Sequence, residues 1–206
     1  MRPWRGIRSS KLFLYGYFAL LMLAGGVVLW ILPTWAGGGE LGFLDALFTS
    51  VSAVAVTGLI TVNTAHYTLT GQMIILVLIQ LGGLGIIAFS TLQLTRAGRR
   101  ISLRRRAVIR EYYIGSVEHD PRRILRNIVF STIAVEAVLF AALLPAFARR
   151  GVARPVFTAV FHAVSAFCNA GFSTFSDSFA AFAAEAATTV PIMLGLGLGG
   201  PGLVVY

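Results

Sequence analysis

The sequence has little charge and few of the side chains that build cofactor or metal sites. Only 12% of its 206 residues are charged, and Cys168 is its one cysteine. A single cysteine excludes an internal disulfide and any cysteine-rich metal site. The sequence also lacks a G-x-S-x-G motif and metal-ligand spacings, which are common local signatures of hydrolases and metalloenzymes. We therefore expect no cofactor in this chain and no enzymatic activity.

Long apolar runs are what the sequence does have. Hydrophobic residues make up 57% of the chain, well above the usage of soluble globular domains. The runs Leu12–Leu32, Met73–Leu94 and Ala186–Tyr206 carry no charge, and Ile128–Phe147 carries one. Each has about 20 residues, enough for a helix to cross the hydrocarbon core of a bilayer. The first run is too long for the core of a signal peptide, so the sequence predicts an all-α integral membrane protein.

The basic residues are clustered, and their distribution predicts the orientation of the helices. Of the 17 Lys and Arg residues, four precede Leu12 and ten lie between Arg96 and Arg126. Basic loops stay on the cytoplasmic side of a membrane, so residues 1–11 and the loop 96–127 are both predicted to be cytoplasmic. This distribution is a topology signal, compatible with contact to anionic membrane lipid, and it argues against binding of nucleic acid.

Two short apolar helices stand out because neither is long enough to span a bilayer. The first lies in the stretch FTSVSAVAVTGL, residues 48–59, and the second in FHAVSAFCNAGF, residues 161–172. If residues 44–58 crossed the membrane, the arginine-rich loop would lie outside the cell. We therefore expect 44–58 to enter from the outer side and return to it. Irregular backbone at membrane depth is tolerated only inside protein or beside a watery cavity.

The second half of the chain repeats the plan of the first. After the span at 128–147 come an outer loop, a short helix at 155–167 and a span from residue 186. Both units run in the same direction, so the sequence predicts two tandem parallel repeats, each made of a helix, a re-entrant pore helix and a helix. A later motif, LGGLG at 81–85, also recurs as LGGPG at 198–202. The short helices align at one constant offset, with the identical pairs Ala46/Ala159, Phe48/Phe161, Val51/Val164, Ser52/Ser165, Ala53/Ala166, Gly58/Gly171 and Thr61/Thr174.

Each short helix ends near a glycine, Gly58 in the first copy and Gly171 in the second. The C-terminal end of a helix carries partial negative charge, which favours a cation. If the chain then turns back in extended form, the carbonyl oxygens of Val56, Thr57 and Gly58 can replace the water shell of an ion. The structural alternative is that both glycines are ordinary helix C-caps. We favour the ion-binding interpretation because the two copies are in register.

Four stretches of the sequence resemble one family of transport proteins. They are FLDALFTSVSAVAVTGLITVNT, GQMIILVLIQLGGLGIIAFSTL, GRRISLRRR and FHAVSAFCNAGFSTFSDSF, and their resemblance to the TrkH/KtrB potassium-transport superfamily covers nearly the whole chain. The resemblance implies a pore of four helix/pore-helix/helix repeats around one filter for K⁺ or Na⁺. It also implies a homodimer of complete pore subunits and a cytosolic nucleotide-binding regulatory subunit. The filter positions that it implies here are Val56, Thr57, Gly58, Leu59, Asn169, Ala170, Gly171 and Phe172.

The sequence contains two of the four repeats that the resemblance implies. We expect a cytoplasmic N-terminus (1–11), a first repeat (12–95), a basic cytoplasmic loop (96–127) and a second repeat (128–206) whose last helix is cut short. The third and fourth repeats are then missing partners. The expected location is the cell membrane, and the expected function is translocation of K⁺ or Na⁺ as part of an uptake system.

Two acidic residues near the predicted pore are further candidates. Glu136 is the only acid inside a predicted span. It has either a functional role as an intramembrane carboxylate or a structural one, buried and hydrogen-bonded to a neighbouring helix. Asp45 falls in the first turn of the first short helix, where a carboxylate complements the positive end of the helix dipole. Attraction of cations to the outer mouth is its alternative role.

Two other functions compete with ion transport. His162 and Ser165 lie three residues apart on one helix, and a serine hydrolase needs a base within hydrogen-bond reach of its nucleophile. The first repeat has Thr49 where the second has His162, however, so the histidine is not part of the shared design. We therefore expect substitution of His162 to leave ion selectivity intact. The second alternative is a channel or carrier for a different small solute.

Overall fold

The computed structural model describes residues 5–97 and 121–200, and it contains no strand within these ranges beyond one isolated bridge between Trp35 and Tyr67. The order long helix, short helix, helix occurs twice. It comprises α1 (Arg5–Ile31), α2 (Phe43–Val54) and α3 (Leu69–Ala97), then α5 (Pro121–Arg149), α6 (Pro155–Phe167) and α7 (Ala186–Gly199), with the short 3₁₀ turns η1 (Thr64–His66) and η3 (Ala180–Phe182) in the loops.

Three of the helices have apolar stretches that are long enough to cross a membrane. These stretches are Leu14–Ile31 in α1, Leu69–Phe89 in α3 and Leu125–Arg149 in α5. The helices α2, α6 and α7 are apolar but have only 12, 13 and 14 residues. The prediction of an all-α membrane protein is confirmed for the described residues.

The helices extend beyond the apolar runs from which they were predicted. Helix α1 begins at Arg5, seven residues before the run that starts at Leu12, and α3 continues to Ala97. Helix α5 begins at Pro121, a residue that suits the first helical position because its missing N–H has no partner there in any case. Backbone hydrogen bonding therefore continues into the basic flanks, because nothing in those flanks breaks a helix at the edge of the apolar run.

Two predicted segments are shorter than expected or only partly described. The first short helix, expected within the segment 44–58, ends at Val54, whereas the second matches its predicted range of 155–167. The predicted span 186–206 is a helix as far as Gly199, and residues 201–206 lie outside the described residues. Residues 98–120, which make up most of the predicted basic loop, also lie outside them.

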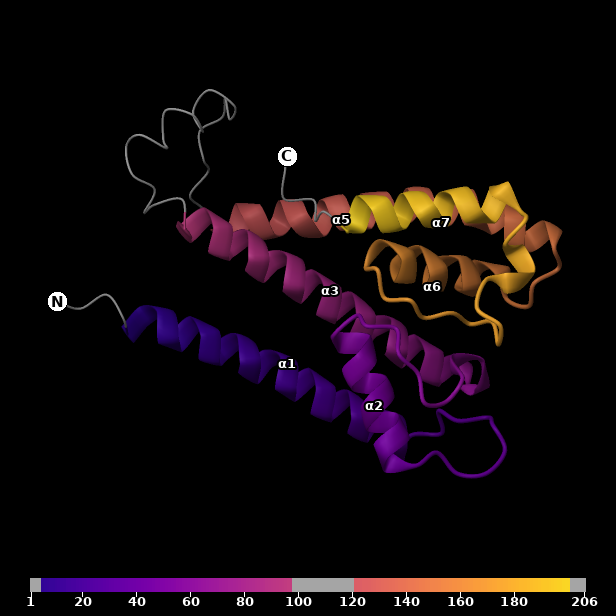
Figure 1. Cartoon of the computed structure of the whole chain (residues 1–206), viewed down its shortest axis with the longest axis horizontal. Helices are drawn as coiled ribbons and strands as arrows, with labels where there is room; N and C mark the ends of the chain where they lie inside the picture. The colour runs from indigo at the N-terminus through magenta and orange to yellow at the C-terminus, as the bar shows by residue number, and fades with distance from the viewer. Residues whose placement is uncertain (1–4, 98–120, 201–206) are drawn as a thin grey trace, which may run out of the picture.

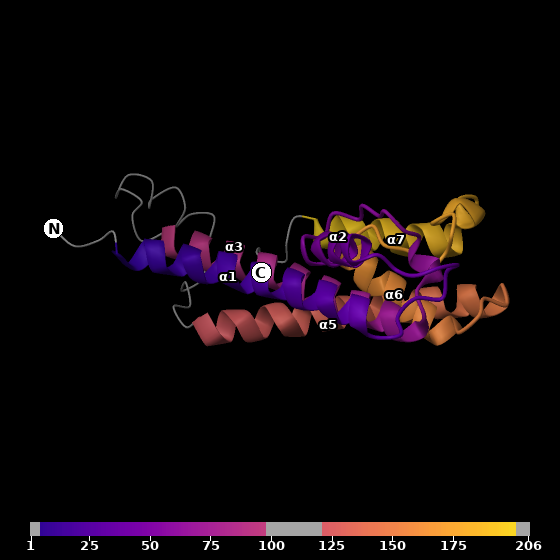
Figure 2. The same cartoon turned by 90° about the horizontal axis from the view of Figure 1, so that it is seen from below.

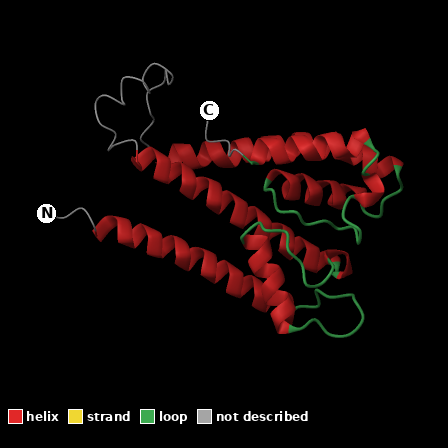
Figure 3. Cartoon of the chain, in the orientation of Figure 1, coloured by secondary structure: helices red, strands yellow, loops and turns green. Residues whose placement is uncertain are grey.

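The helices of each repeat place the loops at one end of the molecule. Helices α1 and α3 run in opposite directions, and α2 folds back between their ends (Figure 1). Seen from below, α2, α6 and α7 lie together at the same end (Figure 2). Figure 3 shows that the described loops of both repeats gather at this end, away from the N-terminus. A hydrogen bond from Ser50 Oγ to the Met22 carbonyl oxygen, 2.8 Å long, fixes α2 to α1.

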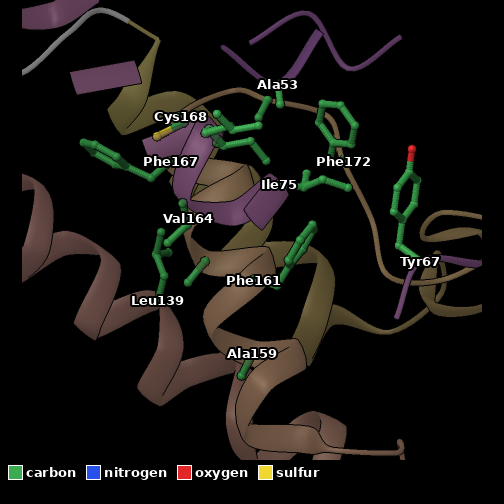
Figure 4. Packing of buried hydrophobic residues seen from close by; sticks show 14 of the residues in the cluster. Ala53, Tyr67, Ile75, Leu139, Ala159, Phe161, Val164, Phe167, Cys168 and Phe172 are labelled. Atoms are coloured by element: carbon green, nitrogen blue, oxygen red, sulfur yellow. The ribbon is translucent and has the colours of Figure 1, made fainter. Parts of the chain in front are cut away.

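The two repeats share one hydrophobic core. Buried side chains of α6, such as Phe161 and Val164, belong to the same cluster as Ala53 of α2 and Ile75 of α3 (Figure 4). Helix α3 contacts α5 and α6 of the second repeat as well as α1 and α2 of its own. Because this packing joins the repeats, the loops that follow α2 and α6 are held next to each other.

The topology can be tested by labelling single cysteines with a membrane-impermeant reagent in intact cells. In a Cys168→Ala background, cysteines at Thr61 and Arg149, both exposed in the structure, are expected to react from outside. A cysteine at Arg105, in the basic loop, is expected to react only after permeabilisation, because basic loops stay cytoplasmic. Reaction of the Arg105 position in intact cells would contradict the predicted orientation.

Candidate functional site

The end of α2 is a complete Schellman motif in which Val56 takes the left-handed position. The N–H of Val56 donates to the Ala53 carbonyl oxygen at 3.2 Å, and the N–H of Thr57 donates to that of Ser52 at 3.0 Å. The φ angle of Val56 is +53°. This conformation is unusual for a β-branched residue, and strain of this kind concentrates at functional sites.

The end of α6 has the same construction at the equivalent positions. The N–H of Asn169 donates to the Ala166 carbonyl oxygen at 3.0 Å, and the N–H of Ala170 donates to that of Ser165 at 2.8 Å. Asn169 has a φ of +58°, which asparagine tolerates better than most residues. Val56 and Asn169, not the glycines, are therefore the left-handed residues that follow the C-caps Ala55 and Cys168 and close the two helices. The interpretation of both glycines as helix caps is wrong.

Gly58 and Gly171 each lie two residues beyond the cap and bring the two loops into contact. Their φ angles are +72° and +71°. A Cβ atom on Gly58 would lie 2.6 Å from the Ala170 carbonyl oxygen and 3.0 Å from the Cα of Gly171. A Cβ atom on Gly171 would lie 3.3 Å from the Cα of Gly58. Glycine is needed here for both its backbone angle and its lack of a side chain.

The last residue of each short helix packs against a glycine of the helix that follows it in the chain. In the first repeat, a Cβ on Gly82 of α3 would collide with the carbonyl group of Val54. In the second, a Cβ on Gly199 of α7 would collide with the carbonyl group of Phe167, which is the residue equivalent to Val54. The LGGLG and LGGPG motifs therefore allow close helix packing, as small residues do between membrane helices.

The neighbouring Gly83 joins the two repeats. A Cβ on Gly83 of α3 would lie 2.7 Å from the sulfur of Cys168, at the end of α6. Gly82 and Gly83 therefore touch the C-terminal ends of both short helices. Because these two ends meet on α3, the partial negative charges of both helix dipoles are directed at one region.

Ser52 and Ser165 occupy equivalent positions but have different partners. The Ser52 hydroxyl lies 3.0 Å from the Thr57 hydroxyl, whereas Ser165 Oγ donates to the carbonyl oxygen of Phe172 at 2.7 Å. The second loop has Ala170 in place of Thr57. Ser165 therefore has no hydroxyl partner at that position, and its own hydroxyl bonds to the backbone instead. The Phe172 carbonyl is thus directed at α6, so we expect Phe172 to orient the loop more than to contact an ion.

The side chains after the two glycines are also exposed to different degrees. Leu59 is 62% exposed, whereas Phe172 is 2% exposed within the core cluster. Asn63 Nδ2, five residues after Gly58, donates to the carbonyl oxygen of Ser176, five residues after Gly171, at 2.9 Å. The second loop is therefore buried against the protein, and this amide links the segments that follow the two glycines.

His162 contacts the second loop directly, which the sequence did not predict. The imidazole is 1% exposed, and its Nε2 atom lies 3.0 Å from the Ser173 hydroxyl. Comparison of the two repeats identifies only the residues that they share. The first repeat has Thr49 at the position of His162, so the comparison did not indicate this contact. The signal was the spacing itself: His162 precedes Ser165 by one helical turn, so both face the returning limb.

The two acidic candidates lie on α5 and in the first turn of α2. Glu136 on α5 accepts a hydrogen bond from Gln80 Nε2 of α3 at 3.2 Å, as the structural alternative described. Its other oxygen, Oε1, is buried without a hydrogen-bond partner among the described residues. Asp45 lies in the first turn of α2 as predicted, although its side chain makes no capping hydrogen bond. A role for either residue in attracting cations stays a prediction.

The chemistry available at this site is that of backbone carbonyl groups. Within the described residues, no group of three or more His, Cys, Asp or Glu side chains could hold a metal ion. Ser165 donates to the backbone, and His162 pairs with Ser173 and with the Thr158 carbonyl oxygen. These partners give no support to the predicted pair of Ser165 as nucleophile and His162 as its base.

Comparison with known proteins agrees with a site for cations. Residues 26–205 match the TrkH family, described as a cation transport protein. The chain is 37% identical to the Ktr system potassium uptake protein B of Vibrio alginolyticus over 84% of its length, and 34% identical to the potassium/sodium uptake protein NtpJ of Enterococcus hirae over 100%. It is 31% identical to the Ktr system potassium uptake protein B of Bacillus subtilis over 98%.

The matched regions cover 38%, 46% and 45% of these three relatives, so the chain spans less than half of their length. The relatives transport cations and are not enzymes, which sets aside the hydrolase alternative. The match extends over both repeats and includes both glycine loops. This chain therefore belongs to the TrkH family of cation transport proteins.

Proposed function

We propose that the chain forms half of a pore that conducts K⁺ or Na⁺ across the cell membrane, with its two glycine loops as half of the selectivity filter. In this arrangement α2 and α6 are re-entrant pore helices that enter and leave on the outer side. The carbonyl oxygens of residues 56–59 and 169–172 line the path of the ion, with Phe172 contributing least.

One observation carries this proposal: the loops have the same conformation in both repeats and meet at their glycines. The residues with positive φ are Val56 and Gly58 in one loop and Asn169 and Gly171 in the other, which are equivalent positions of the two repeats. A pore built from repeats needs identical backbone geometry in each repeat, because carbonyl groups from all repeats surround the same ion. Ordinary connecting loops have no such requirement.

Electrostatics supports a cation as the ligand. Both short helices direct the negative ends of their dipoles at the region where Gly82 and Gly83 lie. Backbone carbonyl oxygens are neutral ligands, which suit a monovalent ion that must also leave the site. The relatives support the choice of ion, since their names specify potassium or potassium/sodium uptake.

The proposed partners follow from the relatives and from the exposed surface. Since the chain covers less than half of each relative, we propose that a third and a fourth repeat complete the pore. Large apolar side chains such as Leu44 and Phe48 on α2, and Met193 on α7, are 78%, 40% and 64% exposed. Membrane lipid or further repeats would cover them. A homodimer of complete subunits and a cytosolic nucleotide-binding regulatory subunit are also proposed.

The experiment that tests this function is growth rescue of a cell that lacks its own K⁺ uptake systems. The complete subunit carrying this half, expressed with a Ktr-type regulatory subunit, is expected to restore growth at low external K⁺. Flux assays with K⁺, Na⁺ and an uncharged solute then separate an ion pore from a carrier of another small solute. Transport of the uncharged solute without cation flux would favour that alternative.

The isolated chain of 206 residues is expected to give no K⁺-selective flux in liposomes. Two loops supply half of the carbonyl groups needed to replace an ion's water shell, and an ion left partly desolvated is unstable. Two copies could in principle pair to rebuild four repeats. Robust K⁺-selective flux together with a discrete dimer would therefore contradict this prediction and favour assembly from half-subunits.

A further inference from the structure

His162 holds a position from which it can fix the second loop. It lies on α6 one turn before Ser165, and its imidazole is 1% exposed. Ser165 holds the loop at Phe172, one residue after Gly171, through a 2.7 Å hydrogen bond. On this limb His162 contacts the two residues that follow Phe172, namely Ser173 and Thr174. Two side chains of α6 therefore fix three consecutive residues of the limb that leaves the proposed filter.

The backbone partners of His162 determine its tautomer. Nδ1 lies 2.8 Å from the carbonyl oxygen of Thr158, which can only accept, so Nδ1 carries the proton. The backbone N–H of Thr174 points at Nε2 over 3.4 Å and can only donate, so Nε2 has a free lone pair. The Ser173 hydroxyl has one proton and lies 3.0 Å from Nε2 but 3.4 Å from the Ser178 carbonyl oxygen, so we assign the proton to the shorter contact with Nε2. His162 is therefore neutral and acts as an acceptor for the loop.

Aromatic rings enclose the imidazole and keep this hydrogen bond away from water. Phe175 stacks on it with a centroid distance of 5.0 Å and an interplanar angle of 12°, and Phe179 meets it edge-on at 4.7 Å. Both phenylalanines come from the same outgoing limb, and Phe147 of α5 lies 5.6 Å away on another side. A hydrogen bond in such an apolar environment is stronger and more costly to lose than one in water.

The first repeat is held differently. Thr49, the equivalent of His162, accepts a hydrogen bond from the Tyr67 hydroxyl at 3.1 Å. Tyr67 lies nine residues after Gly58, whereas Ser173 lies two residues after Gly171. The segment that leaves the first loop is therefore anchored far from Gly58, whereas the segment that leaves the second loop is anchored close to Gly171. This asymmetry makes His162 specific to the second loop.

We propose that His162 is a positioning residue for ion selectivity, whose Nε2 atom holds Ser173 and Thr174 against α6 and so fixes the carbonyl groups around Gly171. The proposal rests on the function proposed above. It reverses the expectation from the sequence that substitution of His162 leaves selectivity intact. His162 touches no ion; it acts through the backbone that does.

The test compares two substitutions in the complete pore subunit. His162→Phe keeps a ring of similar volume among the phenylalanines but removes both hydrogen bonds to the loop, as well as the one to the Thr158 carbonyl oxygen. His162→Gln places an acceptor oxygen near the position of Nε2. The K⁺/Na⁺ flux ratio of His162→Phe is expected to fall about three- to tenfold, the range that one hydrogen bond covers. His162→Gln is expected to recover most of the ratio at an equal amount of folded protein.

Each alternative outcome decides against the proposal. A wild-type ratio in His162→Phe, or equal ratios in the Phe and Gln variants, would overturn it. If His162→Phe does not fold, Ser173→Ala removes the contact with Nε2 from the loop side, together with the Ser173 contacts to Phe175 and Ser178. An unchanged ratio in that variant would overturn the proposal as well. Thr189→Ala, which removes a hydroxyl bond to the Phe182 carbonyl oxygen farther along the same limb, is the matched control and is expected to keep the wild-type ratio.

A second measurement does not depend on transport. In the chain labelled with ¹⁵N at histidine and reconstituted in bilayers, His162 is expected to show a protonated Nδ1 and a bare Nε2. A Ser173→Ala variant is expected to shift the Nε2 resonance. A protonated Nε2 would overturn the proposal. If the complete subunit carries no cation flux, the proposed function fails, and this resonance alone then decides whether His162 holds the loop.

Discussion

Replacement of Gly58 by serine is expected to lower the K⁺/Na⁺ flux ratio of the complete subunit about tenfold, equivalent to about 1.4 kcal/mol of discrimination. Two effects act together. A serine in the left-handed conformation is strained by about 1–2 kcal/mol, and its Cβ would lie 2.6 Å from the Ala170 carbonyl oxygen. The loop must therefore move, and the carbonyl spacing that distinguishes the two ions moves with it. Competition of Na⁺ with K⁺ uptake in proteoliposomes measures the ratio.

Two further glycines separate strain from crowding. Gly171→Ser has a similar φ of +71°, but its nearest neighbour is the Cα of Gly58 at 3.3 Å, so its effect is expected to be smaller. Gly151 has a φ of +67°, and a Cβ added there would meet no heavy atom within 4 Å. Gly151→Ser therefore introduces backbone strain without crowding, and it is expected to keep the wild-type K⁺/Na⁺ flux ratio. Equal ratios for wild type, Gly58→Ser and Gly171→Ser would contradict the assignment of the filter.

A large loss of stability is expected for Gly82→Ala. The added methyl group would collide with the Val54 carbonyl, which belongs to backbone and cannot turn aside. Overpacking of this kind costs about 1–3 kcal/mol, so α2 and α3 are expected to separate. Thermal unfolding of the chain in detergent should then begin at a temperature several degrees lower. Gly199→Ala is expected to act in the same direction, because its methyl group would meet the equivalent carbonyl of Phe167.

The control for this prediction is a glycine with space around it. Gly197 lies in α7, two residues before Gly199, and a Cβ there meets no heavy atom within 4 Å. Gly197→Ala is expected to leave stability unchanged or raise it by up to about 1 kcal/mol, because alanine favours a helix more than glycine does. If Gly82→Ala and Gly197→Ala unfold at the same temperature, close packing at Gly82 does not limit stability.

The sequence by itself determined the class of protein and led to the candidate site. Uninterrupted apolar runs of about 20 residues predict membrane helices, and the basic clusters predict which loops lie inside. The constant offset between the two short helices led to both glycines because a duplicated segment keeps its local hydrogen-bonding pattern. Such features depend on residues close together in the chain, so they are readable without a fold.

The tertiary structure decided which residues cap the helices and which side chains support the loops. A glycine next to a helix end suggested a cap, but the left-handed residues that close the two helices are Val56 and Asn169. Gly58 and Gly171 lie two residues further on, where the close approach of the two loops leaves no room for a side chain. The roles of His162 and Gln80 depend on the same kind of contact. Packing between segments far apart in the chain sets these contacts, and no local pattern of residues encodes it.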